Sequence, residues 1–368
     1  MKNSCLPFAV LASLVAETLL GSIQLMAAEP PEPRAKNHQR VMTFVDDQGH
    51  EQPVKSTADW EHRRRDIIVG LEAAFGPLPD RSKLGPVKFA AVEGSRTETA
   101  THVREKLKLE VEEGDSLLAW LLVPKGLKQR VPGIVAIHQT NGKLGKDEVA
   151  GLGGSKNLQY GLELVERGYI VIAPDYPTLG EYKYDFEKDR YLSGSMKGIW
   201  NHMRCVDLLV AHDHVDHHRI AAIGHSLGGH NSIFLGIFDP RVQAVVTSCG
   251  WTPMHDYYGG KLAGWAGERY APRIRSVYNL DANRLPFDYY ELISALAPRG
   301  FFSCSPVGDS NFDVAGVKKA MPVVREVYDL FGAADRLQVR YPECGHDFPP
   351  EVREEAYRFL DKILQHRR

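Results

Sequence analysis

The stretch Ile220-Ala-Ala-Ile-Gly-His-Ser-Leu-Gly-Gly229 decides the fold of this 368-residue chain. Its first four residues form a short apolar run that predicts a buried strand, and the apolar pattern over 231–238 predicts a helix. Between them lies a G-x-S-x-G pattern, in which small residues flank a serine because the strand-to-helix turn is tight. Such a turn lifts the Ser226 hydroxyl to the carboxyl edge of a sheet, so we predict that Ser226 is a nucleophile.

Alternating strands and helices extend from this motif in both directions. Short apolar runs predict further strands at 133–137, 169–173, 244–246, 300–303 and 337–341. Helical spacing of apolar residues lies between and after them, at 199–210, 317–331 and 352–363. This alternation predicts an α/β fold with a mostly parallel central sheet covered by helices on both faces.

The remaining segments are assigned by their departure from this alternation. Residues 29–100 are predicted to form a polar arm, up to about Lys55, and a helix that starts at a capping box in Ser56-Thr-Ala-Asp59 and ends near Phe75. Residues 101–368 are predicted to form the catalytic domain. It begins with an edge strand in which Leu107, Leu109 and Val111 alternate with charged residues. Residues 251–286, after the sixth strand, break the alternation and are predicted to be an insertion.

A serine nucleophile needs a base, and the base needs an acid that orients it. Where the serine lies on such a turn, the chain order is serine, acid, histidine. His346 is the only histidine between His255 and His366, so this order leaves one candidate for the base.

Three aspartates are candidates for the acid. Asp309 lies a few residues after the strand that ends near Pro306, where its side chain can reach the back of the imidazole, and it is the favoured residue. Asp313 is closer to the next helix and fits its N-cap. Asp256, after the preceding strand, is the third candidate.

Backbone N–H groups are expected to complete the site. The N–H of Leu227, at the start of a helix, can point at an oxyanion. The second donor is expected in the loop His138-Gln-Thr140, at Thr140 or, as the alternative, at Gln139.

Three stretches carry a resemblance to a known group. They are His138-Gln-Thr with Gly145-Lys-Asp-Glu148, Ala173-Pro-Asp-Tyr-Pro177 and Gly224-His-Ser-Leu-Gly-Gly229. Over about residues 100–368 the chain resembles the α/β-hydrolase superfamily, and more narrowly exported esterases related to dienelactone hydrolase and acetyl xylan esterase. Dienelactone hydrolases use a cysteine where this chain has Ser226, which points toward ordinary carboxylic esters. Secreted oligopeptidases are also similar, but they carry a large extra domain for which this chain has no room.

The first 28 residues resemble a signal peptide. Lys2 precedes an apolar stretch from about Leu6 to Leu25, and Met26-Ala27-Ala28 offers a small-residue cleavage site. We therefore expect cleavage after Ala28 and a secreted or periplasmic protein with no stable membrane insertion. A membrane anchor is the alternative. The net charge of -2 gives no basic field for nucleic acid.

Some conspicuous residues have simpler interpretations. The run His212-Asp-His-Val-Asp-His-His218 looks like a metal cluster, but it lies before the strand that ends at Ser226 and so at the opposite edge from the site. Aromatic residues of the insertion can stack on sugar rings, or can form the insertion's own core. They are Trp251, Tyr257, Tyr258, Trp265, Tyr270 and Tyr278. The cysteines after the leader, Cys205, Cys249, Cys304 and Cys344, fit no metal spacing and are expected to be free thiols.

These features together predict a serine esterase. Ser226, Asp309 and His346 would hydrolyse carboxylic esters, including carbohydrate-linked esters, through an acyl-enzyme, with no metal or organic cofactor. Two alternatives remain: a peptidase with the same three residues, and a non-catalytic member of the fold that binds glycans through its insertion.

Overall fold

The computed structural model describes residues 30–188 and 190–367, and within them a ten-stranded sheet forms the centre of the molecule. Its strand order is β12-β11-β10-β9-β7-β8-β6-β5-β3, with β4 paired to β5. The strands are β3 (Lys88–Ala91), β4 (Thr97–Glu98), β5 (His102–Glu112), β6 (Asp115–Pro124), β7 (Val131–Ile137), β8 (Ile170–Pro174), β9 (Val215–His225), β10 (Val242–Ser248), β11 (Gly300–Cys304) and β12 (Leu337–Arg340). The strands from β12 to β8 along this order are parallel, so the predicted mostly parallel sheet is confirmed.

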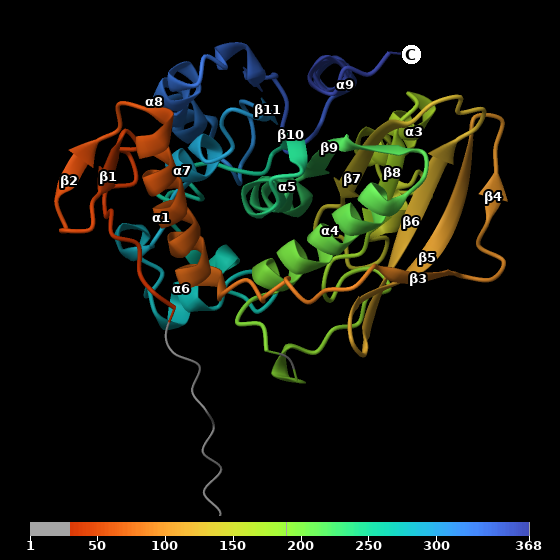
Figure 1. Cartoon of the computed structure of the whole chain (residues 1–368), viewed down its shortest axis with the longest axis horizontal. Coiled ribbons are helices and arrows are strands. Elements are labelled where there is room, and N and C mark those ends of the chain that lie inside the picture. The colour runs from red at the N-terminus through yellow and green to blue at the C-terminus, as the bar shows by residue number, and fades with distance from the viewer. Residues whose placement is uncertain (1–29, 189, 368) are drawn as a thin grey trace, which may run out of the picture.

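Helices cover both faces of the sheet (Figure 1). One face packs against α1 (Thr57–Phe75), α4 (Gly194–Ala211), α5 (Leu227–Phe238), α7 (Tyr289–Ser294) and α8 (Val314–Leu330). The other face packs against α2 (Lys146–Val149), α3 (Tyr160–Glu166) and α9 (Pro350–Ile363). Strand β9 serves both layers, because Ile220 and Ala222 point to the first and Ala221 and Ile223 to the second. This two-sided burial explains why the β9 residues Ile220–Ile223 form a continuous apolar run.

The segment before the first long helix is not the free arm that the sequence suggested. Residues Thr43–Val45 and Glu51–Pro53 form a two-stranded antiparallel hairpin, β1–β2, which packs beside α1 (Figure 1). Val41 and Val54 are buried, and the Ala35 N–H donates to the Asp66 carboxylate in α1 at 2.8 Å. The apolar residues of this segment are too few and too scattered to show a period. Helix α1 begins at the predicted capping box, where Ser56 and Asp59 exchange hydrogen bonds.

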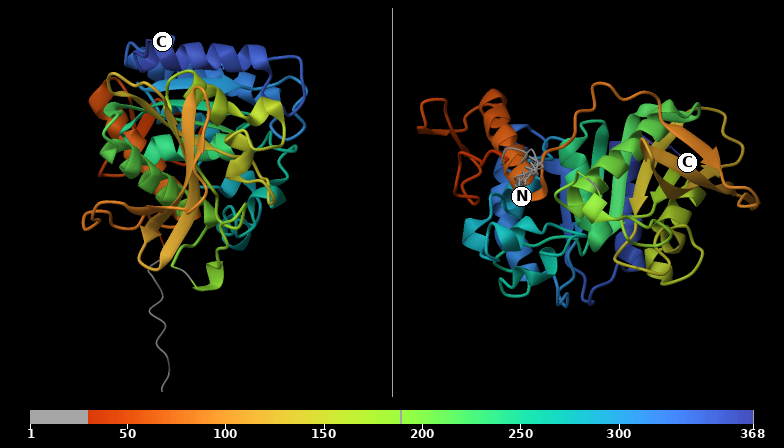
Figure 2. Two further views of the ribbon diagram at one scale, coloured as in Figure 1. Left: turned by 90° about the vertical axis from the view of Figure 1, so that its right-hand side faces the viewer. Right: turned by 90° about the horizontal axis from the view of Figure 1, so that it is seen from below.

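The predicted domain boundary near residue 100 passes through the sheet. Strands β3 and β4 both pair with β5, so residues 88–98 belong to the same sheet as the rest. The strand containing Leu107 is therefore not an edge strand, because β3 lies outside it. All four residues of β3 are exposed, which leaves no apolar pattern that could have revealed the strand. Figure 2 shows the β1–β2 hairpin and this end of the sheet on opposite sides of the molecule.

The insertion after β10 contains only short helical segments. They are a turn at Leu262–Trp265, the helix α6 (Arg273–Ser276) and a turn at Ala282–Arg284. Of the six aromatic residues named from the sequence, Trp251, Trp265 and Tyr278 are buried and belong to the hydrophobic core, whereas Tyr258 is exposed. In the described part of the chain, no helix is both long and apolar enough to cross a bilayer.

Candidate active site

Ser226 occupies a strained turn between β9 and α5. Its backbone angles are φ 54° and ψ −117°, a conformation that residues with a side chain rarely adopt. The Ser226 N–H donates to the Ser248 carbonyl at 2.8 Å, which ties the turn to β10. The hydroxyl makes no capping hydrogen bond to α5, so it is left for other partners.

Two glycines of the motif are required by contact between backbones. A Cβ atom at Gly224 would lie 2.2 Å from the backbone of Gly228. A Cβ atom at Gly228 would lie 1.9 Å from the carbonyl oxygen of Ile137 in β7. Larger residues would therefore push α5 away from the strand ends and move Ser226.

His346 and Asp309 are brought together at the same edge of the sheet. His346 lies in the loop between β12 and α9, and its Nδ1 is 2.9 Å from Oδ2 and 3.0 Å from Oδ1 of Asp309. The Asp309 side chain is fully buried, while 25 % of the His346 side chain is exposed. Burial alone would raise the pKa of Asp309, but the hydrogen bonds from His346 and from the N–H groups of Asn311 and Phe312 outweigh it and lower that pKa. The acid is thus held as a carboxylate.

Two neighbouring rings fix the position of the His346 imidazole. Its centroid lies 4.8 Å from that of His225, the residue next to Ser226, in an edge-to-face arrangement. On another side the Phe312 ring is stacked with it, at 6.1 Å and an interplanar angle of 17°. Phe312 in turn pairs with Tyr257 through an isolated β-bridge, which links the insertion to the loop that carries Asp309. The imidazole is therefore beside the Ser226 turn.

The other two aspartates have different partners. Asp313 is the N-cap of α8, and its side chain accepts the Ala315 N–H at 2.8 Å, as expected for the alternative role. Asp256 forms an ion pair with Lys319 at 2.7 Å. Of the three candidates, only Asp309 contacts His346 within the described residues.

The loop after β7 contains the expected second oxyanion donor. Thr140 is exposed, and its hydroxyl is 3.0 Å from the Tyr270 hydroxyl of the insertion. Its backbone N–H has no acceptor among the described residues. Leu227 is the first residue of α5, so its N–H has no acceptor within the helix. Both N–H groups stay candidates for the oxyanion hole.

Comparisons with known proteins agree with this architecture. A family model described as the prolyl oligopeptidase family matches residues 156–302. Among curated proteins, the chain is 27% identical over 301 residues to YtaP of Bacillus subtilis, which is named as a hydrolase, covering 79% of this chain and 96% of that protein. It is 23% identical to carbohydrate esterase MZ0003 from an unknown prokaryotic organism, covering 79% and 78% of the two chains.

Solved structures of other proteins have a similar fold. A glucuronoyl esterase from Solibacter usitatus superposes with a TM-score of 0.67 at 17% identity, over 90% of this chain and 98% of that one. A Bacteroides fragilis protein described as an acetyl xylan esterase superposes with a TM-score of 0.60 at 20% identity, over 87% and 81%. The chain has the α/β-hydrolase fold.

A further residue near the site is Glu148 of α2, which the sequence indicated only as part of the stretch Gly145-Lys-Asp-Glu148 that carries the resemblance. Glu148, which is 3 % exposed, accepts hydrogen bonds from Gln139 Nε2 at 2.9 Å and Asn141 Nδ2 at 3.2 Å. These two side chains flank Thr140, and the second Glu148 oxygen accepts the Ser155 N–H at 2.9 Å. Glu148 therefore holds both sides of the loop that carries Thr140.

The histidine run set aside from the sequence lies apart from the site. His217 and His218 are exposed near the start of β9, whereas Ser226 follows its end. All four cysteines in the described chain are free thiols, as predicted, and only Cys344 is not fully buried.

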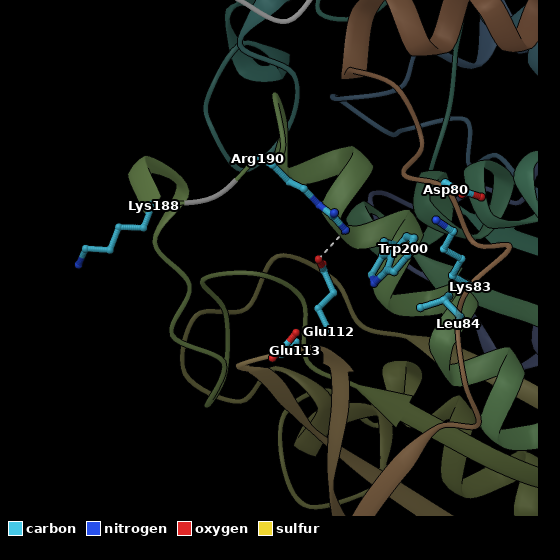
Figure 3. A pocket seen from close by; sticks show the side chains of 8 residues that line it. All are labelled: Asp80, Lys83, Leu84, Glu112, Glu113, Lys188, Arg190 and Trp200. Carbon is cyan, nitrogen blue, oxygen red and sulfur yellow. Dashed lines mark hydrogen bonds and ion pairs between the residues drawn. The ribbon is translucent and has the colours of Figure 1, made fainter. Parts of the chain in front are cut away.

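One surface hollow of the molecule also lies away from the site. It has a volume of about 500 Å³ and is lined by the linker after α1, the β5–β6 turn, α4 and the residues before α4. Its walls are mostly charged, and Arg190 is paired there with Glu112 at 2.7 Å (Figure 3). Neither Ser226 nor His346 lines this hollow.

Proposed function

We propose that this α/β-hydrolase is a carboxylic ester hydrolase in which Ser226, His346 and Asp309 act as a triad. The observation that carries the proposal is the 2.9 Å contact between Asp309 and His346 Nδ1 beside a serine held at φ 54°. This is the arrangement in which an acid fixes the imidazole and the imidazole serves a nucleophile.

The reaction would proceed in two steps. His346 Nε2 takes the Ser226 proton while the Ser226 oxygen attacks the ester carbonyl, and the N–H groups of Leu227 and Thr140 stabilise the oxyanion. His346 then gives the proton to the leaving alcohol, which leaves an acyl-enzyme. Water attacks the acyl-enzyme in the second step, again with His346 as base, and releases the acid. These steps require no metal or organic cofactor.

We propose esters of carbohydrates as the substrate class. The named relatives and structural neighbours include a carbohydrate esterase, a glucuronoyl esterase and an acetyl xylan esterase. Near the site, the hydroxyls of Thr140 and Tyr270 lie 3.0 Å apart. The hydroxyl of exposed Tyr258 donates to Asn311 in the loop that carries Asp309. Such groups suit a sugar, which presents hydroxyls and an apolar ring face.

A peptidase is the second candidate, because the matching family model is that of prolyl oligopeptidases. The two activities are separated by a panel of acetylated, feruloylated and uronate-methylated sugars, a simple aryl ester and peptide amides. We expect hydrolysis of at least one sugar ester at a kcat/KM well above that of any amide. The opposite ranking would favour the peptidase.

The triad itself is tested with Ser226→Ala. Loss of the nucleophile should reduce kcat by several powers of ten without unfolding the chain, and the variant should no longer react with a serine-directed phosphonate. Ser310→Ala is the matched control, because Ser310 is an exposed serine in the loop that carries Asp309 and should retain full activity. If Ser226→Ala kept near-normal activity, the assignment would be wrong. If the native protein failed to react with the phosphonate, the result would favour the alternative of a non-catalytic protein that binds glycans.

We also propose that the protein is exported after cleavage of residues 1–28. That segment lies outside the described residues, and the support is its charge and apolar pattern.

A further inference from the structure

Three metal-ligating side chains converge beside the nucleophile turn. His225 ends β9, Cys249 follows β10, and His346 lies in the loop after β12. One ligand atom from each residue can be chosen so that all three lie within 4.8 Å of one another. Because the residues come from separate segments, no metal motif is visible in the sequence.

The hydrogen bonds of His225 leave one nitrogen with a free lone pair. Its Nδ1 is 3.0 Å from Ser248 Oγ. The single proton of Ser248 Oγ is directed to the Asp347 carbonyl at 3.4 Å or to Cys249 Sγ at 3.7 Å. In the tautomer in which His225 Nδ1–H donates to Ser248 Oγ, the lone pair of the imidazole lies on Nε2.

His346 is arranged in the same way. Asp309 accepts from Nδ1–H, which leaves the lone pair on Nε2. A metal-bound histidine is usually supported by a hydrogen bond that its non-ligating N–H donates, often to a carboxylate. The third side chain, Cys249, is 2 % exposed and its thiol lies 3.3 Å from the Asp347 carbonyl. Two imidazoles and a thiol form a ligand set for zinc, whereas magnesium and calcium prefer oxygen.

We propose that His225, Cys249 and His346 form a zinc-binding site, and that zinc bound there reversibly inhibits the enzyme. The binding half stands on the cluster alone, and the inhibition half rests on the proposed function. Zinc bonds of about 2.0 Å to nitrogen and 2.3 Å to sulfur place tetrahedral ligands about 3.5 Å apart. The ligand atoms lie within 4.8 Å of one another and must therefore move closer by up to about 1.3 Å. The partly exposed His346 loop offers both the entry path and the movement. Binding uses the Cys249 thiolate and releases its proton to solvent.

Inhibition follows from competition for one lone pair. When Nε2 of His346 is bonded to zinc, it cannot accept the Ser226 proton. Chelation frees the nitrogen again, so the inhibition is reversible and depends on zinc concentration.

The first experiment measures hydrolysis of an aryl ester against zinc concentration, with recovery on addition of EDTA. We expect inhibition by zinc and none by magnesium. Cys249→Ser keeps the side-chain shape but loses the soft ligand, so the inhibition constant should rise on the order of tenfold or more, while activity without zinc stays near normal. Cys344→Ser is the control, since Cys344 is the one described cysteine that is not buried and it lies outside the cluster. An unchanged inhibition constant in Cys249→Ser would overturn the proposal.

The second experiment detects binding without turnover. Cobalt(II) is added to Ser226→Ala, and a thiolate-to-cobalt charge-transfer band is expected that is absent in Ser226→Ala/Cys249→Ser. The substitutions His217→Gln and His218→Gln are included in both proteins, because these rings lie 3.9 Å apart on the surface and can bind metal themselves. If Ser226→Ala gave the band but the native protein had no esterase activity, the metal site would stand and the proposed function would be refuted. Absence of the band, in protein whose circular dichroism shows it folded, would refute the metal site.

Discussion

Replacing Asp309 by asparagine should nearly abolish turnover while leaving the fold intact. In the structure, Oδ1 of Asp309 accepts the N–H groups of Asn311 at 2.8 Å and Phe312 at 3.2 Å, and Oδ2 faces Nδ1 of His346 at 2.9 Å. An asparagine that keeps its oxygen on the two backbone donors must turn its NH₂ group toward His346. The imidazole can then only accept at Nδ1, so its proton moves to Nε2, the atom that has to take the Ser226 proton.

The wrong tautomer in a serine triad reduces kcat by about ten-thousandfold, which corresponds to about 5.5 kcal/mol of lost transition-state stabilisation. The two backbone hydrogen bonds remain, so the free energy of unfolding should change little. The assay is kcat and KM on an aryl ester, combined with thermal unfolding followed by circular dichroism.

Asp313 supplies the matched comparison. Its carboxylate caps α8 by accepting the Ala315 N–H, so Asp313→Ala should lower the unfolding free energy by about 1 kcal/mol and leave kcat unchanged. Asp313→Asn preserves the cap and should be close to neutral in both assays. If Asp309→Asn stayed within tenfold of the native enzyme while Asp313→Asn lost activity, the acid would be Asp313. Two active asparagine variants would move the acid to Asp256.

Three further predictions concern other parts of the chain. Glu148→Gln should lower kcat by about ten- to a hundredfold with little change in KM, because the loop that holds Thr140 loses an acceptor and the oxyanion donor is displaced. Steady-state kinetics on the folded variant would test this prediction. An unaffected kcat would exclude this role of Glu148. Burial lowers the pKa of His202 to about 3 from an ordinary value of 6.5, so between these values only the unfolded chain binds this proton and stability falls as the pH falls. His202→Leu should therefore flatten the dependence of unfolding free energy on pH by about 1.4 kcal/mol per unit between about pH 6 and 4, and exposed His217→Leu should not. Mature protein recovered from its host should begin near Glu29, and a soluble cytoplasmic form that retains Met1 would contradict export.

The parallel sheet and its helices were predictable because their residues are buried on both sides or along one stripe. The second half of β9, Ile220–Ile223, is a continuous apolar run, and the α8 stripe containing Val317, Val324 and Tyr328 has a clear helical period. Strand β3 is exposed and the β1–β2 hairpin contributes few buried side chains, so neither leaves a pattern, and both were missed.

The order of residues along the chain allowed only part of the candidate site to be predicted. Order along the chain selected Ser226 and His346 but could not separate Asp309 from Asp313, and only the fold shows which of the two faces the imidazole. His225 and Cys249 were not recognised as neighbours of His346. They meet through three different strand ends, and sequence spacing carries no information about such a meeting.

The attachment of the first folded residues has a consequence for the order of events during synthesis. Arg63 of α1 is paired with Glu291 of α7, and His38 Nε2 lies 2.8 Å from the Leu285 carbonyl oxygen. A chain that emerges N-terminus first lacks these two partners until residues 285 and 291 have been made, so both contacts can form only late in synthesis. If the chain crosses a membrane before folding, this dependence on late residues delays the native state until the passage is nearly complete.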